Sequence, residues 1–249
     1  MKRVSPAPVP WKQRLYTSYV TSGQAGWSGR DPETLFLPRK YYIRQLIAQY
    51  LPEEEDAAIL DLGCGHGAFL YFLAQAGYRN VVGIDTSAEQ IEAAHRLGIH
   101  NAHYGDALEY LCDVESGSVD IVIVFDLLEH LDKQELFDFT EQIYRVLRVN
   151  GVCLAHVPNA EGLLGMRIRY GDLTHHLAFT RSSARQLFQT IGFSNIECFE
   201  ERPVMHGLKS VVRRLIWDLG TLPLRLLFSA ETGDPTNILS SNLLVRVTK

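Results

Sequence analysis

Short apolar runs alternate with longer amphipathic stretches over most of the chain. The apolar runs contain almost no polar residue and predict buried strands over 57–62, 80–85, 119–125 and 152–157, with a short strand before Gly105. The amphipathic stretches carry cap residues or glycine stops at their ends and predict helices over 68–76, 87–98, 133–148 and 181–191. Strands that alternate with helices predict a parallel sheet, and uniformly apolar strands indicate that helices cover both of its faces.

The C-terminal part adds two strands and an insertion between them. The segments 194–200 and 241–248 predict the last two strands. In the insertion, apolar residues recur with helical spacing on both sides of a break near Gly220 and Pro223, so we expect a pair of helices. Its first part, 203–230, contains four basic residues and one acidic residue. The basic residues are Lys209, Arg213, Arg214 and Arg225, and the acidic residue is Asp218. A basic amphipathic pair suits a lid over an anionic acceptor, a homodimer surface or a peripheral contact with a membrane surface.

The N-terminal part has no regular pattern over residues 13–37, although Asp31 and Pro32 indicate a turn or a helix start. Pro38 suits the first position of a helix that would extend to Leu51. We therefore divide the chain into an N-terminal arm or substrate cap over 1–37, a core over 38–202 and 238–249, and a helical insertion over 203–237.

Composition and length narrow the class of protein. A chain of 249 residues, 46% of them hydrophobic and 21% charged, suits one globular domain with insertions and excludes a disordered chain. The formal net charge of −5 argues against a nucleic-acid partner. The four cysteines form no CxxC pair, which predicts neither a zinc site nor a disulfide scaffold. With no secretory signal and no apolar run of about 18 residues, we expect a cytoplasmic protein, peripheral to the inner membrane surface if the insertion contacts lipid.

Candidate chemistry begins where the first strand ends. Asp61 precedes a loop with glycines at 63, 65 and 67, and such a loop between a strand and a helix lets the backbone turn sharply and approach a ligand closely. The loop alone would also fit a dinucleotide site. However, Asp61 would repel a pyrophosphate and suits a ligand with an ammonium group. Asp85 ends the second strand, where a carboxylate can accept both ribose hydroxyls, and Asp106 follows the third, where it can accept from an adenine amino group.

These motifs resemble those of the class I S-adenosylmethionine-dependent methyltransferases. The match covers residues 59–67, 82–85, 105–107 and 146–151, in the order and at the distances of that family. The resemblance implies an α/β fold: a Rossmann-like, doubly wound seven-stranded sheet whose last strand is antiparallel, here with a helical insertion before it. It also implies S-adenosylmethionine as cofactor and S-adenosylhomocysteine as product. The residues that we expect to bind the cofactor are Asp61, Gly63, Cys64, Gly65, Gly67, Asp85, Thr86, Gly105, Asp106, Ala107, Phe125 and Asp126.

A hydroxyl acceptor loses a proton during methyl transfer, so a general base or a metal helps the reaction. His130 follows the fourth strand, and His175 and His176 lie on the loop after the fifth strand, just before a helix start. A histidine is a suitable base at neutral pH. We expect His175 or His176 to act as the base and His130 to be a third catalytic candidate. A structural hydrogen bond is the alternative role for each.

The segment Asp126-x-x-Glu129-His130, with a later histidine, resembles the Glu-x-x-Glu-His…His metal site of small-RNA 3′-end 2′-O-methyltransferases. Ubiquinone-pathway O-methyltransferases carry a similar Glu-x-x-Glu-His. In this interpretation Asp126, Glu129, His130 and His175 would hold a divalent cation that activates a hydroxyl. Asp126 departs from the pattern, because both families have Glu there, and many methyltransferases have Leu-Glu-His at this place without a metal.

The layout is also similar to bacterial methyltransferases of cell-surface glycan pathways, which share the Thr-His-His segment at 174–176 and a late Glu-Thr-Gly at 231–233. We therefore expect O-methylation of a sugar or other small-molecule hydroxyl in glycan or secondary metabolism. The alternatives are a metal-dependent RNA 2′-O-methyltransferase, a non-catalytic cofactor-binding protein that regulates a partner, and a nicotinamide oxidoreductase. Asp61 and Asp106 argue against the oxidoreductase.

Overall fold

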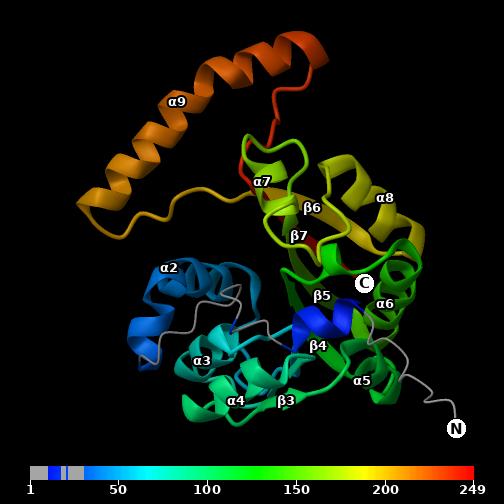
Figure 1. The fold of residues 1–249 in the computed structure, drawn as a ribbon. Helices are drawn as coiled ribbons and strands as arrows, with labels where there is room; N and C mark the ends of the chain where they lie inside the picture. Colours follow the sequence, from blue (N-terminus) through cyan, green and yellow to red (C-terminus); the bar gives the residue numbers. More distant parts are fainter. Residues whose placement is uncertain (1–10, 18–20, 22–30) are drawn as a thin grey trace, which may run out of the picture.

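Seven strands form one sheet, in the order β3-β2-β1-β4-β5-β7-β6, in the computed structural model, which describes residues 11–17, 21 and 31–249 (Figure 1). The strands from β3 to β5 are parallel, whereas β7 runs antiparallel to both β5 and β6. Their bounds are β1 Ile59–Leu62, β2 Val81–Asp85, β3 Ala102–Tyr104, β4 Val119–Phe125, β5 Leu147–Pro158, β6 Ser194–Glu200 and β7 Asn242–Thr248. The predicted fold class is confirmed, including the antiparallel last strand and the helix before it.

Helices connect the strands and cover the sheet. Their bounds are α1 Trp11–Tyr16, α2 Pro32–Tyr50, α3 Ala68–Gln75, α4 Ala88–Arg96, α5 Ala107–Asp113, the 3₁₀ turn η1 Leu128–His130, α6 Lys133–Val146, α7 Gly165–Arg169, α8 Arg181–Ile191 and α9 Leu208–Thr232. The sequence predicted α8 and β4 with their observed bounds. It missed the short helices α1, α5 and α7, and the segment expected to be irregular therefore begins with a helix.

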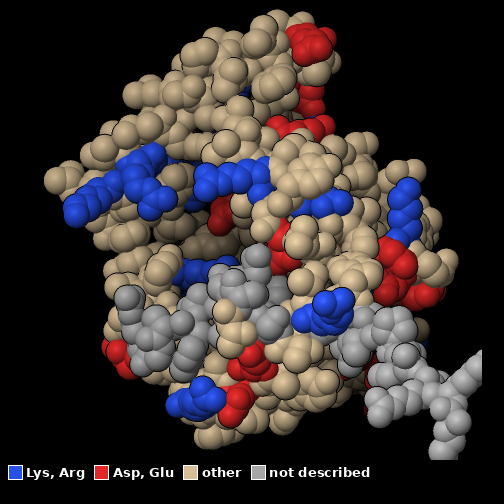
Figure 2. Space-filling model, viewed as in Figure 1, with Lys and Arg blue, Asp and Glu red and all other residues tan. Residues whose placement is uncertain are grey.

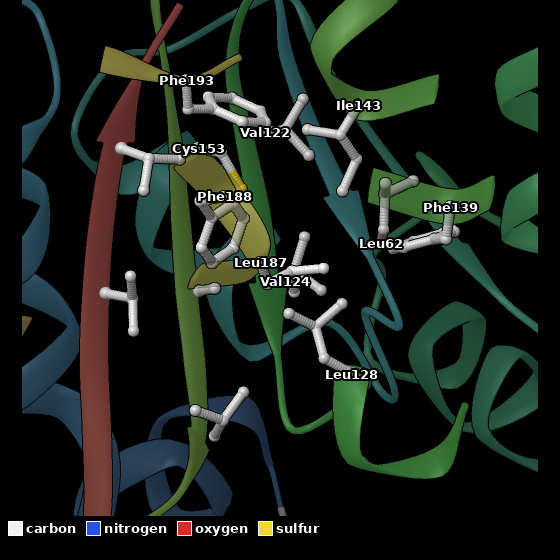
Figure 3. Close-up of a cluster of buried hydrophobic side chains, with 14 of the residues drawn as sticks. Leu62, Val122, Val124, Leu128, Phe139, Ile143, Cys153, Leu187, Phe188 and Phe193 are labelled. Carbon is white, nitrogen blue, oxygen red and sulfur yellow. The ribbon is translucent and has the colours of Figure 1, made fainter. Parts of the chain in front are cut away.

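Two hydrophobic clusters pack on opposite faces of the sheet, because side chains alternate along each strand. On β4, Val122 and Val124 point into the cluster built with α5, α6 and α8, whereas Ile121 and Ile123 point into the cluster built with α2, α3 and α4. Figure 3 shows part of the first cluster, in which Phe139 and Ile143 of α6 lie beside strand side chains. This double burial explains why the strands are uniformly apolar, and it fixes the strand ends that form the site.

Helix α2 begins earlier than the sequence predicted. Asp31 caps it, accepting a hydrogen bond from the Thr34 backbone N–H at 3.0 Å, and Pro32 takes the first helical position. Pro38 therefore lies inside the helix rather than at its start. The prediction chose the wrong proline, because both have a geometry compatible with a helix start and only the Asp31 cap distinguishes them.

The insertion contains one long helix, α9, rather than the expected pair. Pro223 cannot donate a hydrogen bond to the Leu219 carbonyl, but Leu219 lies on the exposed side, where water can satisfy that carbonyl. Just before the proline, the Thr221 hydroxyl donates to the Trp217 carbonyl at 2.7 Å. Figure 1 shows α9 standing out from the sheet as a continuous helix.

One face of α9 is apolar and exposed. The large side chains on this face are Leu208, Val212, Leu215, Ile216, Leu219, Leu222, Leu226 and Leu227. The opposite face is tied to the core by Arg225, which bonds to Glu200 of β6 at 2.5 Å. None of the helices within the described ranges is long and apolar enough to cross a membrane.

Candidate active site

A cavity of about 1180 Å³ opens at the carboxyl ends of β1, β2 and β4. Parallel strands bring these ends to one edge of the sheet, which is where open α/β sheets bind ligands. The predicted cofactor residues that line the cavity are Asp61, Gly63, Cys64, Gly65, Asp85, Thr86, Asp106, Ala107, Phe125 and Asp126. Gly67 and Gly105 are outside the lining. They lie in the loops that shape the cavity, after β1 and β3 respectively.

The loop after β1 holds its shape through glycine conformations and a carboxylate. Gly63 and Gly65 have φ values of 77° and 56°, a left-handed region that favours glycine. The backbone N–H of Gly65 donates to Asp85 Oδ2 at 2.8 Å, and the Ser87 N–H donates to Asp85 Oδ1 at 2.8 Å. Asp85 therefore connects the glycine loop to the start of α4 and stands at the position predicted for ribose recognition.

Two buried carboxyls give this half of the cavity its electrostatic character. Burial, and then the neighbouring Asp85, raise the pKa of Asp61 to about 8. Burial also raises the pKa of Asp85, against the backbone hydrogen bonds from Ser87 and Gly65. Both groups would gain from a cationic ligand, because a positive charge favours their ionised forms.

Asp106 is exposed and caps α5. Its Oδ1 accepts from the backbone N–H groups of Leu108 and Glu109 at 2.8 and 3.0 Å. This cap explains the helix that the sequence analysis missed, because Asp106 was interpreted as a ligand group alone. Asp106 and Ala107 both line the cavity, so the cap position and the expected adenine site coincide.

Glu129, His130 and His175 meet on the other side of the cavity. Within the described part of the chain they form a group whose potential ligand atoms all lie within 4.8 Å of one another. His175 Nε2 is 3.9 Å from Glu129 Oε1, and the rings of His130 and His175 are 4.5 Å apart in an edge-to-face arrangement. The Glu129 carbonyl also accepts from the backbone N–H of His176 at 2.6 Å, which holds the histidine loop against η1.

The hydrogen bonds define the tautomers of both histidines. His175 Nδ1 faces the Ile168 carbonyl at 3.1 Å, so Nδ1 carries the proton. The Thr174 hydroxyl donates to Asp172 at 2.6 Å and therefore accepts from His130 Nδ1 at 2.7 Å. Each ring is thus left with an unprotonated Nε2.

Burial keeps both rings neutral. Burial, and then His175, lower the pKa of His130 to about 4, and burial also lowers the pKa of His175. Burial, and then Asp126, raise the pKa of Glu129. Its Oε2 is buried and has no hydrogen-bond partner among the described residues. The cluster therefore offers two neutral nitrogen bases and a carboxyl group that a cation would stabilise.

The structure separates His176 and Asp126 from this cluster. His176 is exposed and packs against Trp11, with ring centroids 5.6 Å apart. Asp126, which has a φ of 54°, instead pairs with His156 Nδ1 at 2.6 Å and lies 3.8 Å from Arg39.

His156 and Arg39 were not among the predicted site residues. Burial alone would lower the pKa of His156, but the carboxylates of Asp126 and Glu201 outweigh it and raise the pKa to about 10. The one available signal was the presence of His156 as a single polar residue in the apolar run of β5. The Arg39 contact depends on the placement of α2 and has no local signal.

Helix α1 belongs to the site as well. Lys12 and Tyr16 line the cavity, and Lys12 Nζ lies 3.1 Å from Glu135 of α6. In Figure 1 this short blue helix lies in front of the sheet beside β4. The rest of the expected N-terminal arm, residues 1–10, 18–20 and 22–30, lies outside the described residues.

Comparison with known proteins agrees with this geometry. A family model described as a methyltransferase domain matches residues 37–198. A probable S-adenosylmethionine-dependent methyltransferase of Mycolicibacterium smegmatis is 26% identical over 196 residues, which are 78% of this chain and 71% of that protein. A small RNA 2′-O-methyltransferase of Mus musculus is 25% identical over 70% of this chain, and a ubiquinone biosynthesis O-methyltransferase of Bordetella avium is 31% identical over 41% of it. The chain spans less than half the length of these last two relatives, 46% and 44% respectively.

Solved structures share the fold. A methyltransferase from Archaeoglobus fulgidus has a TM-score of 0.65 at 19% identity, covering 93% of this chain and 99% of that one. The phosphoethanolamine N-methyltransferase 2 of Haemonchus contortus, solved with S-adenosylmethionine, has a TM-score of 0.61 at 16% identity, covering 98% of this chain and 60% of that one. The chain belongs to the class I S-adenosylmethionine-dependent methyltransferases and therefore binds S-adenosylmethionine.

Proposed function

We propose that the protein transfers the methyl group of S-adenosylmethionine to a hydroxyl of a sugar or another small polyhydroxyl acceptor. The observation that carries this proposal is the pair of neutral imidazoles at the cavity, each with an unprotonated Nε2. An amine acceptor of low pKa needs little help from a base, whereas a hydroxyl must lose its proton as the new bond forms.

The proposed reaction follows from this arrangement. The acceptor oxygen attacks the methyl carbon in line with the carbon–sulfur bond, and the sulfonium becomes the neutral thioether of S-adenosylhomocysteine. The hydroxyl proton passes to Nε2 of His175 or His130. Asp172, behind Thr174 and His130, favours the resulting positive charge on both rings. Positioning by the cavity supplies the rest of the rate enhancement.

Replacing the imidazoles tests this assignment. We expect His175→Ala and His130→Ala each to lower the turnover about 10²- to 10⁴-fold, with unchanged affinity for S-adenosylhomocysteine. Transfer of labelled methyl groups to an extract of the source organism measures the first effect, and calorimetry measures the second. His176→Ala is the matched control, because this neighbouring ring is exposed. Full activity of the double variant His130→Ala/His175→Ala would remove the proposed base.

A cation-assisted variant of the same reaction is the second candidate. Its specific support is the group formed by Glu129, His130 and His175, with the unpartnered Glu129 Oε2 and both Nε2 atoms unprotonated. Three such ligands, with imidazoles oriented through Nδ1 bonds, suit a divalent transition metal. When bound, the ion would lower the pKa of the acceptor hydroxyl. Asp126 is committed to His156 and is not part of this set.

Chelation distinguishes the two variants. The cation variant predicts that activity is lost after dialysis against a chelator and returns with manganese or zinc, and that Glu129→Gln lowers manganese binding measured by electron paramagnetic resonance. Activity that survives the chelator favours the metal-free base. Label transferred to the 3′-terminal 2′-hydroxyl of RNA would instead support the same activity as that of the small RNA methyltransferase. The net charge of −5 argues against this acceptor.

A further inference from the structure

A second cavity, of about 490 Å³, lies between α2, α9 and the start of β7. It shares Pro38, Ile168 and Asn242 with the first cavity, so the two have a continuous wall. Its volume is within the range of small-molecule sites. It is lined by parts of the chain that the methyl-transfer site does not use, among them Trp217 and Arg213 of α9.

Three residues that line this cavity each carry a buried polar atom without a hydrogen-bond partner among the described residues. These atoms are the hydroxyl of Tyr42, the indole Nε1 of Trp217 and the side-chain Oδ1 of Asn242. They come from α2, α9 and β7, which are distant in the sequence. Buried polar groups without a partner are rare and costly, so their convergence on one cavity indicates a ligand that completes them.

The chemistry of these groups selects the ligand. Trp217 Nε1 can only donate a hydrogen bond, and burial, followed by Glu201 and Asp126, raises the pKa of Tyr42, which stays protonated and able to donate. Arg213 adds a guanidinium, and no carboxylate lies within 4 Å of it among the described residues. Glu201, the acidic group of the wall, is already bonded to His156 at 3.2 Å and to Asn242 Nδ2 at 3.4 Å.

The charge of the surface around the cavity also favours an anionic ligand. On the face shown in Figure 2, Lys and Arg side chains gather along the rim of a hollow between α9 and the rest of the molecule. The donors and the cation favour an oxyanion, and Asn242 Oδ1 can accept from a neighbouring hydroxyl. The insertion thus supplies one wall of a cavity that prefers an acidic, hydroxyl-rich molecule.

We infer that this second cavity binds an oxyanion group, a phosphate or a carboxylate, carried by the methyl acceptor. The inference rests on the proposed function, in that it assigns the oxyanion to the molecule whose hydroxyl lies beside His175. The acceptor would extend from the methyl-transfer site past Asn242, with its acid group near Arg213. A sugar phosphate or a uronic acid has this chemistry.

Binding can be measured without turnover through the indole N–H of Trp217. The full chain, labelled with ¹⁵N and saturated with S-adenosylhomocysteine, is titrated with inorganic phosphate, glucuronate and neutral glucose. Trp217→Phe identifies the resonance. We expect a saturable shift with phosphate or glucuronate and none with glucose. Phosphate alone would indicate a phosphorylated acceptor, and glucuronate alone a uronic acid.

Matched variants separate a site from general attraction of anions. Arg213→Gln should weaken the binding at least tenfold, and Tyr42→Phe should weaken it several-fold. Lys209→Gln removes the same charge one turn earlier on α9, outside the cavity lining, and should leave the affinity unchanged. Equal losses in both charge variants, or no saturable shift with either anion, would overturn the inference.

A labelling experiment links the oxyanion to the acceptor. Methyl transfer to an extract of the source organism should fall after the extract is treated with phosphatase, or after its carboxylates are amidated, and Arg213→Gln should raise KM more than it lowers kcat. Label that is insensitive to both treatments would overturn the link. If no label enters any fraction while Trp217 still reports saturable binding, the proposed reaction fails and the oxyanion cavity stands.

Discussion

Asp61 shows how one residue can report on the charge of the ligand. Its carboxyl is buried at the end of β1, and its pKa is raised to about 8. Without a cationic ligand beside it, this carboxyl is therefore largely protonated near neutral pH. The ammonium group of the cofactor would favour the ionised form. Binding should therefore release a proton, and proton release makes the affinity depend on pH.

We expect the affinity for S-adenosylhomocysteine to rise between pH 6 and pH 8 by at most about tenfold per pH unit. Calorimetry in buffers of different ionisation enthalpy measures both the affinity and the released proton. Asp61→Asn should bind more weakly and flatten this dependence. An affinity that falls with rising pH would contradict the assignment of Asp61 to the ammonium group.

Asp85 makes the second residue-scale prediction. Asp85→Ala removes the acceptor of the Gly65 and Ser87 backbone bonds and the group expected at the ribose hydroxyls. We expect the affinity for S-adenosylhomocysteine to fall about 10- to 100-fold, the equivalent of one hydrogen bond to a charged group. Unchanged affinity in calorimetry, for a variant with a native circular dichroism spectrum, would refute the cofactor assignment.

At the scale of elements, His156 of β5 ties together the ends of two strands. Its ring bonds to Asp126 after β4 and to Glu201 after β6, and it stacks on Phe125 at 4.9 Å. The folded state raises its pKa from 6.5 to about 10. The stability from this ion pair is therefore complete below pH 6.5 and is lost as the pH rises through about 10.

His156→Phe keeps the stacking and removes both hydrogen bonds. We expect it to lower the free energy of unfolding by about 1–3 kcal/mol near neutral pH, with a difference from the native protein that narrows as the pH approaches 10. Urea unfolding at several pH values measures this. A difference that widens with rising pH would show that His156 is neutral in the folded state.

The elements also show which features a sequence can predict. Thr180 and Gly192 bound α8 through local cap geometry, so its ends follow from nearby residues. The parallel sheet follows from the alternation of strands and helices, and the cofactor loop follows from motif spacing, which are also local patterns. The antiparallel last strand was expected only from the family resemblance. The Asp126–His156 pair and the Tyr42–Trp217–Asn242 cavity join residues that are distant along the chain. No local pattern encodes these contacts, so they could not be predicted from the sequence.

At the scale of the whole molecule, α9 is attached to the sheet without being part of its core. Neither hydrophobic cluster contains an α9 residue. The two ends of the insertion are adjacent, because the Glu201 backbone N–H donates to Ser240 Oγ at 3.1 Å. The core should therefore fold without the insertion, whose roles as a lid, a dimer surface or a membrane contact remain predictions.

Replacing 203–237 by a short glycine–serine loop tests this independence. We expect the affinity for S-adenosylhomocysteine to stay within about twofold of the native value, because the residues predicted to bind the cofactor lie at the ends of β1 and β2 and at the start of α5, away from the insertion. Methyl transfer should fall strongly, since α9 forms a wall of the second cavity. Calorimetry and labelled transfer measure the two effects, and loss of cofactor binding would contradict the proposed division of the chain.

The most direct test of the account is to identify the atom that receives the methyl group. The protein is incubated with ¹³C-methyl-labelled S-adenosylmethionine and fractions of an extract of the source organism, and the products are examined by carbon NMR. We expect an O-methyl signal on an acidic, hydroxyl-rich molecule, retained with His176→Ala and lost with His130→Ala/His175→Ala. An N-methyl product, or an O-methyl product that the double variant still forms at the native rate, would contradict the proposed transfer to a hydroxyl.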